Sequence, residues 1–141
     1  MEAKWTKKKI LIYGLLTIIA LMLIKIGRKM EENIERSILE DCTYTIGTVI
    51  SFHLSSSSSP ELKYNYIVDG IEIEGRRYYK YIPYEYYENP PQNSKEKELF
   101  VVAYSNNNVK KCLLLFDYPI KQEGDFDKYL DNFKVNPPRI P

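Results

Sequence analysis

The residues from Ile10 to Ile26, ILIYGLLTIIALMLIKI, constrain the fold of this chain more than any other segment. The first fifteen of them carry no charge, and only Tyr13 and Thr17 have polar side-chain groups. A helix rises about 1.5 Å per residue, so these seventeen residues span roughly 25 Å. A hydrocarbon core is about 30 Å thick, and ~17 residues are the lower limit for crossing it. We therefore predict a transmembrane helix over residues 10–26.

Positive charges stand at both ends of this apolar segment. They are Lys7, Lys8 and Lys9 before it, and Lys25, Arg28 and Lys29 at its end and beyond. Long lysine side chains at helix ends reach toward the bilayer surface, which lengthens the usable span. Trp5 lies where an amphipathic ring favours the membrane interface. The residues that we assign to the membrane anchor are Trp5, Ile10, Leu16, Leu23 and Ile26.

Other interpretations of the apolar segment fit its neighbours less well. A cleaved signal peptide needs small residues at a cleavage site, and no such triplet follows Ala20. A lipoprotein needs its cysteine directly after the apolar run, whereas Cys42 comes sixteen residues after Ile26. A buried core helix has a polar face, and this segment is apolar all round. An uncleaved anchor is the favoured interpretation, with the signal peptide and the core helix as alternatives.

The basic residues also indicate an orientation. The N-terminal group is the denser one, and positive residues close to a membrane span favour the cytoplasmic side. We predict that residues 1–9 form a basic cytoplasmic tail and that the soluble domain is extracytoplasmic, in a periplasm or beyond. The chain would then be a single-pass membrane protein whose first partner is the lipid bilayer.

The charge of the soluble part argues against nucleic acid as a partner. Residues 1–41 hold eight Lys and Arg against six acids, and the remainder holds twelve bases and thirteen acids. Nucleic-acid binding needs clustered positive charge that neutralises phosphates. A nearly neutral domain without a basic stripe does not offer it.

Residues 27–41 are predicted to continue the helix as a juxtamembrane stalk. This stretch contains one glycine, at its start, and no proline, and Ile26, Met30, Ile34 and Ile38 recur every four residues. The stripe favours packing on the domain that follows. The alternative is a short self-associating seam that would make the chain a homo-oligomer through its stalk.

Residues 42–119 are predicted to form a β-domain, because the apolar period changes from helical spacing to strict alternation. The expected strands are Thr43–Leu54, Leu62–Val68, Ile71 to about Tyr81, Glu98–Ser105 and Val109–Phe116. Asp69-Gly70 predicts a tight type I′ hairpin turn. Gly47 inside the first strand predicts a bulge or bend. Glu98–Ser105 is apolar on both faces, so we expect it inside the sheet.

The end of the chain, residues 120–141, is predicted to hold a short helix and an extended tail. Residues 124–135 have aromatic and aliphatic side chains at helical spacing, and Asp125 is the expected N-cap. The predicted fold class is therefore mainly β with one N-terminal transmembrane helix. The β part is a small five-stranded antiparallel barrel or rolled sheet, followed by a short C-terminal helix.

Several of these segments together resemble a family of small bacterial domains of unknown function. The similar parts are Y-T-I-G-T-V-I at 44–50, Y-N-Y-I-V-D-G at 64–70, a strand ending near Tyr104 and L-F-D-Y-P at 115–119. Members of that family carry a short β-domain that opens with a T-x-G-x-V strand and is anchored by transmembrane helices. The resemblance covers about residues 43–119 and implies no catalytic residues.

Candidate residues for chemistry are few. His53, the only histidine, alternates away from the apolar side of its strand, so we expect it to face solvent. Glu72 and Glu74 share one face of a strand beside a turn, which favours a solvated hairpin rather than an acid–base pair. We predict no metal site, no cofactor and no enzymatic activity.

The two cysteines, Cys42 and Cys112, leave two alternatives open. They are either separate core thiols or one disulfide that ties the first strand to the last, as closure of a barrel would allow. An extracytoplasmic location permits the bond.

A cluster of tyrosines is the strongest candidate for a recognition surface. Its members are Tyr78, Tyr79, Tyr81, Tyr84, Tyr86 and Tyr87. Tyrosine offers a large rigid contact area with a polar tip, which makes it common at binding surfaces. The alternative is that these rings pack over one end of the barrel.

The function predicted from the sequence is therefore that of an anchored interaction module. We expect a protein partner and a place as an accessory subunit of an envelope complex. The alternative is a membrane-anchored immunity or inhibitor protein that neutralises a toxin, with the tyrosine cluster as its contact surface.

Overall fold

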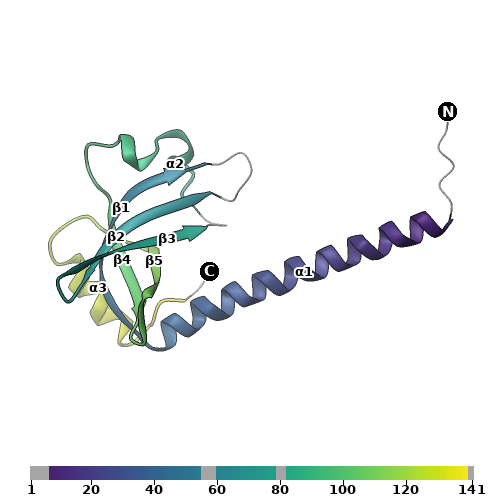
Figure 1. Cartoon of the computed structure of the whole chain (residues 1–141). Coiled ribbons are helices and arrows are strands. Elements are labelled where there is room, and N and C mark those ends of the chain that lie inside the picture. The colour runs from purple at the N-terminus through teal and green to yellow at the C-terminus, as the bar shows by residue number, and fades with distance from the viewer. Residues whose placement is uncertain (1–6, 55–59, 79–81, 140–141) are drawn as a thin grey trace. The chain divides into compact units, whose positions relative to one another are not determined.

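The computed structural model describes residues 7–54, 60–78 and 82–139. The chain divides into two compact units, Met1–Arg36 and Ser37–Pro141. The described part of the first unit is helical and belongs to α1 (Lys7–Glu40), whose last residues are part of the second unit (Figure 1). One helix therefore includes both the predicted span and the predicted stalk.

The second unit is built on a single antiparallel sheet of five strands, as predicted (Figure 1). The strands are β1 (Cys42–His53), β2 (Glu61–Val68), β3 (Ile71–Tyr78), β4 (Leu99–Ser105) and β5 (Asn108–Ile120). Their order in the sheet is β3-β2-β1-β4-β5, so β3 and β5 are the edge strands. The sheet curls but does not close, which confirms the rolled-sheet form of the prediction. β4 lies inside the sheet, as its two apolar faces indicated.

Short helices complete this unit. α2 (Glu85–Glu88) and the 3₁₀ turn η1 (Pro91–Asn93) lie between β3 and β4, and α3 (Asp125–Phe133) follows β5. The side chain of Gln92 in η1 donates to the carbonyl of Phe52 at 3.0 Å and accepts from its N–H at 2.9 Å. Gln92 thereby binds both backbone groups of Phe52, which lies near the end of β1 and pairs with Leu62 in the β1–β2 ladder.

The hairpin between β2 and β3 forms at the predicted turn. Asp69 and Gly70 both have positive φ, 52° and 79°. A type I′ turn requires this conformation at both central residues, and the Asp-Gly pair adopts it readily. Val68 and Ile71 flank the turn as partners in the ladder.

One main hydrophobic core lies on the inner face of the rolled sheet. Its most buried members include Leu62, Tyr64 and Tyr66 from β2, each exposed by 1% or less. Val102 and Leu114 join them from β4 and β5. Removing a large side chain of this kind from water contributes roughly 1.5–3 kcal/mol. Alternation along β2 thus places one face of the strand in the core.

Of the bulge or bend predicted at Gly47, the bulge is not formed at that residue. Gly47 keeps a regular register with Tyr66 on one side and Phe100 on the other, and the irregularity lies between Val49 and Ser51. The glycine is needed for another reason, because a Cβ at this position would lie 2.4 Å from Val102 Cγ2. Close packing inside the roll, rather than an extra residue in the strand, requires glycine at this position.

A second, smaller core lies on the outer face of the sheet. Ile38 from the end of α1 is buried with Ala103 and Leu113. Earlier members of the predicted stalk stripe, Met30 and Ile34, are exposed by 60% and 51%. Packing on the domain is therefore confirmed for Ile38, and self-association through the stalk stays a prediction.

The predicted end of β5 is wrong. Asp117-Tyr118-Pro119 does not terminate the strand, which continues to Ile120 with an irregular register before Pro119. Proline has no N–H to donate, so it is tolerated at an edge strand such as β5, where one side of the ladder needs no partner.

The predicted N-cap of α3 is also wrong. Gly124, with φ of 87°, occupies the cap, and Asp125 is the first helical residue. The Asp125 carboxylate instead accepts the backbone N–H groups of Lys121 at 3.1 Å and Gln122 at 3.0 Å. Asp125 therefore stabilises the loop before the helix and does not cap the first turn of the helix.

Candidate membrane anchor and interaction surfaces

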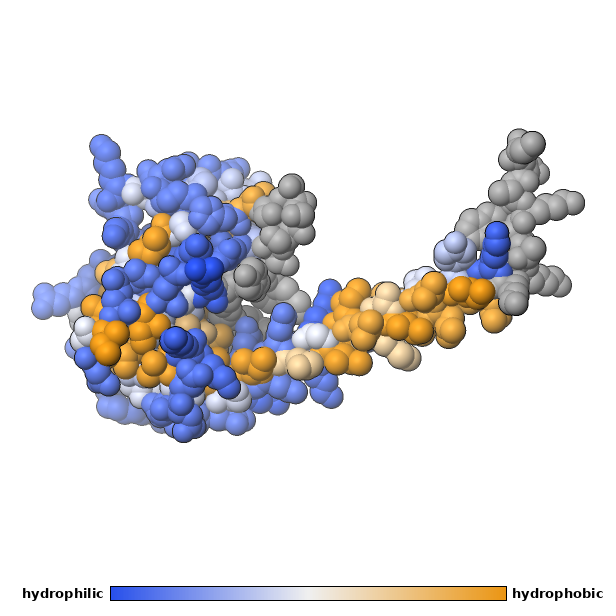
Figure 2. All heavy atoms as spheres, in the orientation of Figure 1, coloured by the Kyte–Doolittle hydropathy of each residue, from blue (hydrophilic) through white to orange (hydrophobic). Residues whose placement is uncertain are grey.

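α1 is long and apolar enough to cross a membrane, and it is the one described helix with these properties. Its apolar side chains from Ile10 to Ile26 are all exposed, from 45% at Ile19 to 75% at Leu11. Figure 2 shows apolar side chains along most of this helix. The hydroxyl of Thr17 donates to the carbonyl of Tyr13 at 2.8 Å, so this polar group is satisfied within the helix. A helix near an N-terminus with these features also fits a signal sequence.

The predicted tyrosine cluster separates into buried and exposed members. Tyr84 and Tyr87 are exposed by 74% and 44%, and their rings stack with centroids 6.3 Å apart. Tyr86, in α2, is only 3% exposed and belongs to the main core. Tyr79 and Tyr81 lie outside the described residues, as does the side chain of Tyr78. Packing over the core is therefore confirmed for Tyr86, and a recognition surface at the exposed rings stays a prediction.

The hydroxyl of Tyr86 has a defined structural role. It donates a hydrogen bond to the Glu98 carboxylate. Burial, followed by this contact with Glu98, raises the pKa of Tyr86 well above its usual range. The group is thus a permanent donor inside the domain, and its ring is not available for recognition.

The two cysteines are free thiols. Cys42 packs against the outer core beside Ile38, whereas Cys112 packs against the inner core. The ladder agrees, because Cys112 pairs with Tyr104 while Cys42 pairs with the next residue, Ser105. Neighbouring residues in a strand point to opposite faces, so the two sulfur atoms lie on opposite sides of the sheet. The disulfide alternative is not formed.

Two tyrosine hydroxyls on β2 reach across the inside of the roll to the edge strand β5. Tyr64 on β2 lies with its oxygen 3.2 Å from the Cys112 sulfur on β5. Tyr66 on β2 donates to the carbonyl of Val109 on β5 at 2.5 Å. Burial raises the pKa of Tyr66, so the hydroxyl remains protonated. These contacts hold β5 close to β2 across the inside of the roll.

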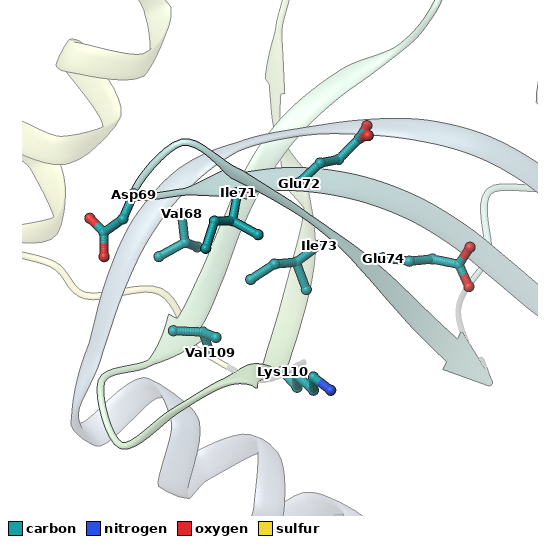
Figure 3. A pocket seen from close by; sticks show the side chains of 8 residues that line it. All are labelled: Val68, Asp69, Ile71, Glu72, Ile73, Glu74, Val109 and Lys110. Atoms are coloured by element: carbon teal, nitrogen blue, oxygen red, sulfur yellow. The ribbon is translucent and has the colours of Figure 1, made fainter.

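An open groove remains between the two edge strands, and Figure 3 shows it from close by. We call it the β3–β5 groove, and its volume is about 560 Å³. The lining residues are Val68, Asp69, Ile71, Glu72, Ile73, Glu74, Val109 and Lys110. Val68, Ile71 and Ile73 lie over Val109, while the carboxylates of Glu72 and Glu74 point away from the groove (Figure 3). Its size is within the range of small ligand sites, but it is open along one side.

The remaining candidates from the sequence occupy ordinary surface positions. His53 is exposed at the end of β1, as predicted. Glu72 accepts from the Asn65 side chain at 2.8 Å, and Glu74 accepts from Arg76 at 2.7 Å. Among the described residues, no three His, Cys, Asp or Glu side chains group closely enough to hold a metal ion.

Sequence reasoning missed the apolar residues of the β3–β5 groove. The sequence pattern predicts only that Ile71 and Ile73 belong to the second strand of a hairpin and that Val109 begins the last strand. The signal that was available is the exposure of edge strands in any sheet that does not close. Comparison with protein-family models, with curated proteins and with solved structures finds no match for this chain.

Proposed function

We propose that this chain is a single-pass membrane protein whose rolled sheet serves as an interaction module for a protein partner. The observation that carries the proposal is the exposure of every apolar side chain from Ile10 to Ile26. Soluble proteins rarely leave contiguous apolar patches above a few hundred Å² uncovered. A lipid bilayer would remove these side chains from water, which the described part of the chain does not do.

The geometry of α1 supports a spanning position. The seventeen residues from Ile10 to Ile26 provide roughly 25 Å, a little less than a hydrocarbon core of about 30 Å. α1 begins at Lys7 and continues to Glu40, so backbone hydrogen bonding is not interrupted at either end of the apolar segment. Lys9 and Lys25 extend the span by reaching toward the interface.

The proposed orientation has the N-terminus in the cytoplasm and the β-domain outside it. Its support is the density of lysines before the span. Fusion of alkaline phosphatase or of green fluorescent protein after Pro141 distinguishes the two sides. We expect phosphatase activity and no fluorescence. Fluorescence without phosphatase activity would reverse the orientation and leave the anchor itself unaffected.

Support for a protein partner comes from the exposed aromatic pair Tyr84 and Tyr87. Tyrosine is enriched at protein interfaces because one side chain combines apolar area with a hydrogen-bonding tip. The ring of Tyr87 also packs edge-on against Phe52 of the main core, with centroids 5.1 Å apart, whereas Tyr84 is 74% exposed. Tyr84 is therefore the member of the pair that can be changed with the least effect on the core.

Affinity capture from native membranes tests the partner. The full chain with a C-terminal tag is solubilised in mild detergent, and proteins that co-purify are quantified. We expect one protein in a fixed ratio to the chain, with recovery reduced by Tyr84→Ser. Val135→Ser is the matched control, because Val135 is 78% exposed on another part of the domain. Absence of any protein in fixed ratio, or equal recovery with both variants, would contradict the proposed surface.

A further inference from the structure

The β3–β5 groove lies along two sheet edges, and the two edges differ in how many backbone hydrogen-bonding groups they present. Within the described residues, β3 pairs in the sheet with β2 and β5 pairs with β4. The outer side of each strand faces the groove. An edge strand of this kind is a template for pairing with another extended segment.

The hairpin register identifies the outward backbone groups of β3. Val68 and Ile71 flank a two-residue turn, and such a turn is closed by a hydrogen-bonded pair. Hydrogen-bonded and non-hydrogen-bonded pairs alternate along an antiparallel ladder. Glu72 and Glu74 are therefore in non-hydrogen-bonded pairs, and their N–H and C=O groups point to the outer edge.

On the β5 side of the groove, fewer backbone groups are available for hydrogen bonds to an added strand. The carbonyl of Val109 already accepts the hydroxyl of Tyr66, and the N–H of Lys110 donates to the side chain of Asn108 at 3.1 Å. These side-chain contacts occupy backbone groups that an added strand would need. A segment entering the groove thus finds its backbone partners on β3.

The lining of the groove selects the side chains of such a segment. Ile71, Ile73 and Val109 give an apolar surface, with Ile71 exposed by 67%. The charged residues of the lining are Asp69, Glu72, Glu74 and Lys110, which is three acids against one base. Side chains alternate between faces along a strand, so an entering segment presents one set to the apolar lining and the other to the carboxylates.

We propose that the β3 edge binds an extended, basic peptide segment of a partner protein, which pairs with the strand through its backbone. Apolar residues of the segment lie against Ile71, Ile73 and Val109, and alternating Lys or Arg residues lie near Glu72 and Glu74. The proposal rests on the proposed function and names the surface and the chemistry of its partner. Backbone pairing supplies affinity, and the charges supply selection.

A second copy of this chain fits the edge less well. Antiparallel pairing of two β3 strands centred on Ile73 places Glu72 of each copy opposite Glu74 of the other. Like charges directly opposite each other destabilise a strand pair. A basic segment replaces both repulsions with attractions.

The test uses the full chain in neutral detergent micelles and fluorescent peptides of roughly eight residues, the length of β3. The first peptide alternates valine and lysine. The second replaces each lysine with glutamate. The third has the first sequence with N-methyl groups on alternate residues, which block one hydrogen-bonding edge. Fluorescence anisotropy measures binding, and amide chemical shifts of Glu72, Ile73 and Glu74 locate it.

We expect the valine–lysine peptide to bind and to shift the amide signals of β3, and we expect the other two peptides to bind much more weakly. The double variant Glu72→Lys/Glu74→Lys should weaken binding by about tenfold, since two attractions become repulsions. The matched control is Glu88→Lys/Glu96→Lys, which makes the same charge change at exposed residues away from the groove. It should leave binding within about twofold.

Several outcomes overturn the proposal. Equal binding of the N-methylated peptide excludes strand pairing, and equal weakening by both double variants excludes selection at this edge. If no peptide binds, but the chain self-associates and the Glu72→Lys/Glu74→Lys variant changes that self-association, the groove binds a second copy of the chain instead. Failure of the peptides while a membrane partner is still captured in fixed ratio removes this surface and leaves the proposed function intact.

Discussion

At the scale of single residues, Gly75 is a second position, after Gly47, at which packing inside the roll leaves no room for a side chain. A Cβ at Gly75 would lie 2.4 Å from the Tyr64 ring, because that ring crosses β3 on its way to Cys112. The neighbour is the ring of a fully buried residue, which cannot move aside easily. Gly75 therefore allows the tyrosine contact that joins β2 to β5.

Gly75→Ala should destabilise the β-domain by about 1–3 kcal/mol, the usual cost of overpacking a core. Denaturant unfolding followed by near-ultraviolet circular dichroism of the tyrosines gives the free energy of unfolding. Gly27→Ala is the control, because a Cβ there meets nothing within 4 Å. The double variant Gly75→Ala/Tyr64→Leu should lose less than the sum of its single changes. Additive losses would contradict a direct clash with Tyr64.

The cysteines give a second prediction at this scale. The protein purified without reductant should show two thiols that react with maleimide after denaturation. In the folded state Cys42 should react slowly, because burial raises the pKa of its thiol. The contact with Tyr44 lowers this pKa and the charge of Asp41 raises it, both by less than burial does. A thiolate is the reactive form, so a raised pKa lowers reactivity. Finding no reactive thiol after denaturation would contradict the opposite-face arrangement of Cys42 and Cys112.

At the scale of secondary-structure elements, α3 is held to the sheet by aromatic contacts and by the loop before it. Phe133 lies 4.8 Å from both Tyr44 and Tyr118, measured between ring centroids. Tyr129 donates to the carbonyl of Pro119 at 3.1 Å. Asp125 fixes the loop by accepting the N–H groups of Lys121 and Gln122.

The loop before α3 makes stability depend on pH. The hydrogen bond from the Lys121 N–H, with smaller contributions from Gln122 and Lys128, lowers the pKa of Asp125. A carboxyl with a lowered folded-state pKa stabilises the fold above its unfolded pKa, about 3.9, and the stabilisation is lost as pH falls through the folded value. Asp125→Asn should therefore lower Tm at pH 7, and the difference from wild type should shrink as pH falls below about 4. Asp127→Asn, in the same first turn, is the control. A Tm difference that does not change with pH would contradict this role of Asp125.

Elements that depend on local patterns could be predicted from the sequence. Asp69-Gly70 specifies its turn by backbone preference alone, and alternation in β2 places Tyr64 and Tyr66 in the core whatever the partner strands are. The true bulge near Ile50 and the continuation of β5 through Pro119 were not predictable in this way. Both depend on which strands pair and which strand is an edge, and no local pattern contains that information.

At the scale of the whole molecule, the chain combines a helix that is long and apolar enough to cross a membrane with a domain that has an open sheet edge. Residues far apart in sequence create the β3–β5 groove, since Ile71 and Val109 meet only after the sheet has rolled. The sequence therefore predicted the anchor and the class of fold, but not the groove. The sequence identified the tyrosine cluster but not which of its rings are exposed. Tyr86 is buried because it packs against Phe52 and Phe116, which lie far from it in the sequence.

The measurement that tests the central claim most directly is alkaline carbonate extraction of membranes that contain the full chain, with the mass of the retained chain determined. We predict that an uncleaved chain of 16.7 kDa stays in the membrane pellet. The variant Leu16→Asp/Ile19→Asp should be released, because each buried charge near the middle of a span costs about 2.5–3.5 kcal/mol. Release of the unaltered chain, or a retained chain shortened at its N-terminus, would contradict the account.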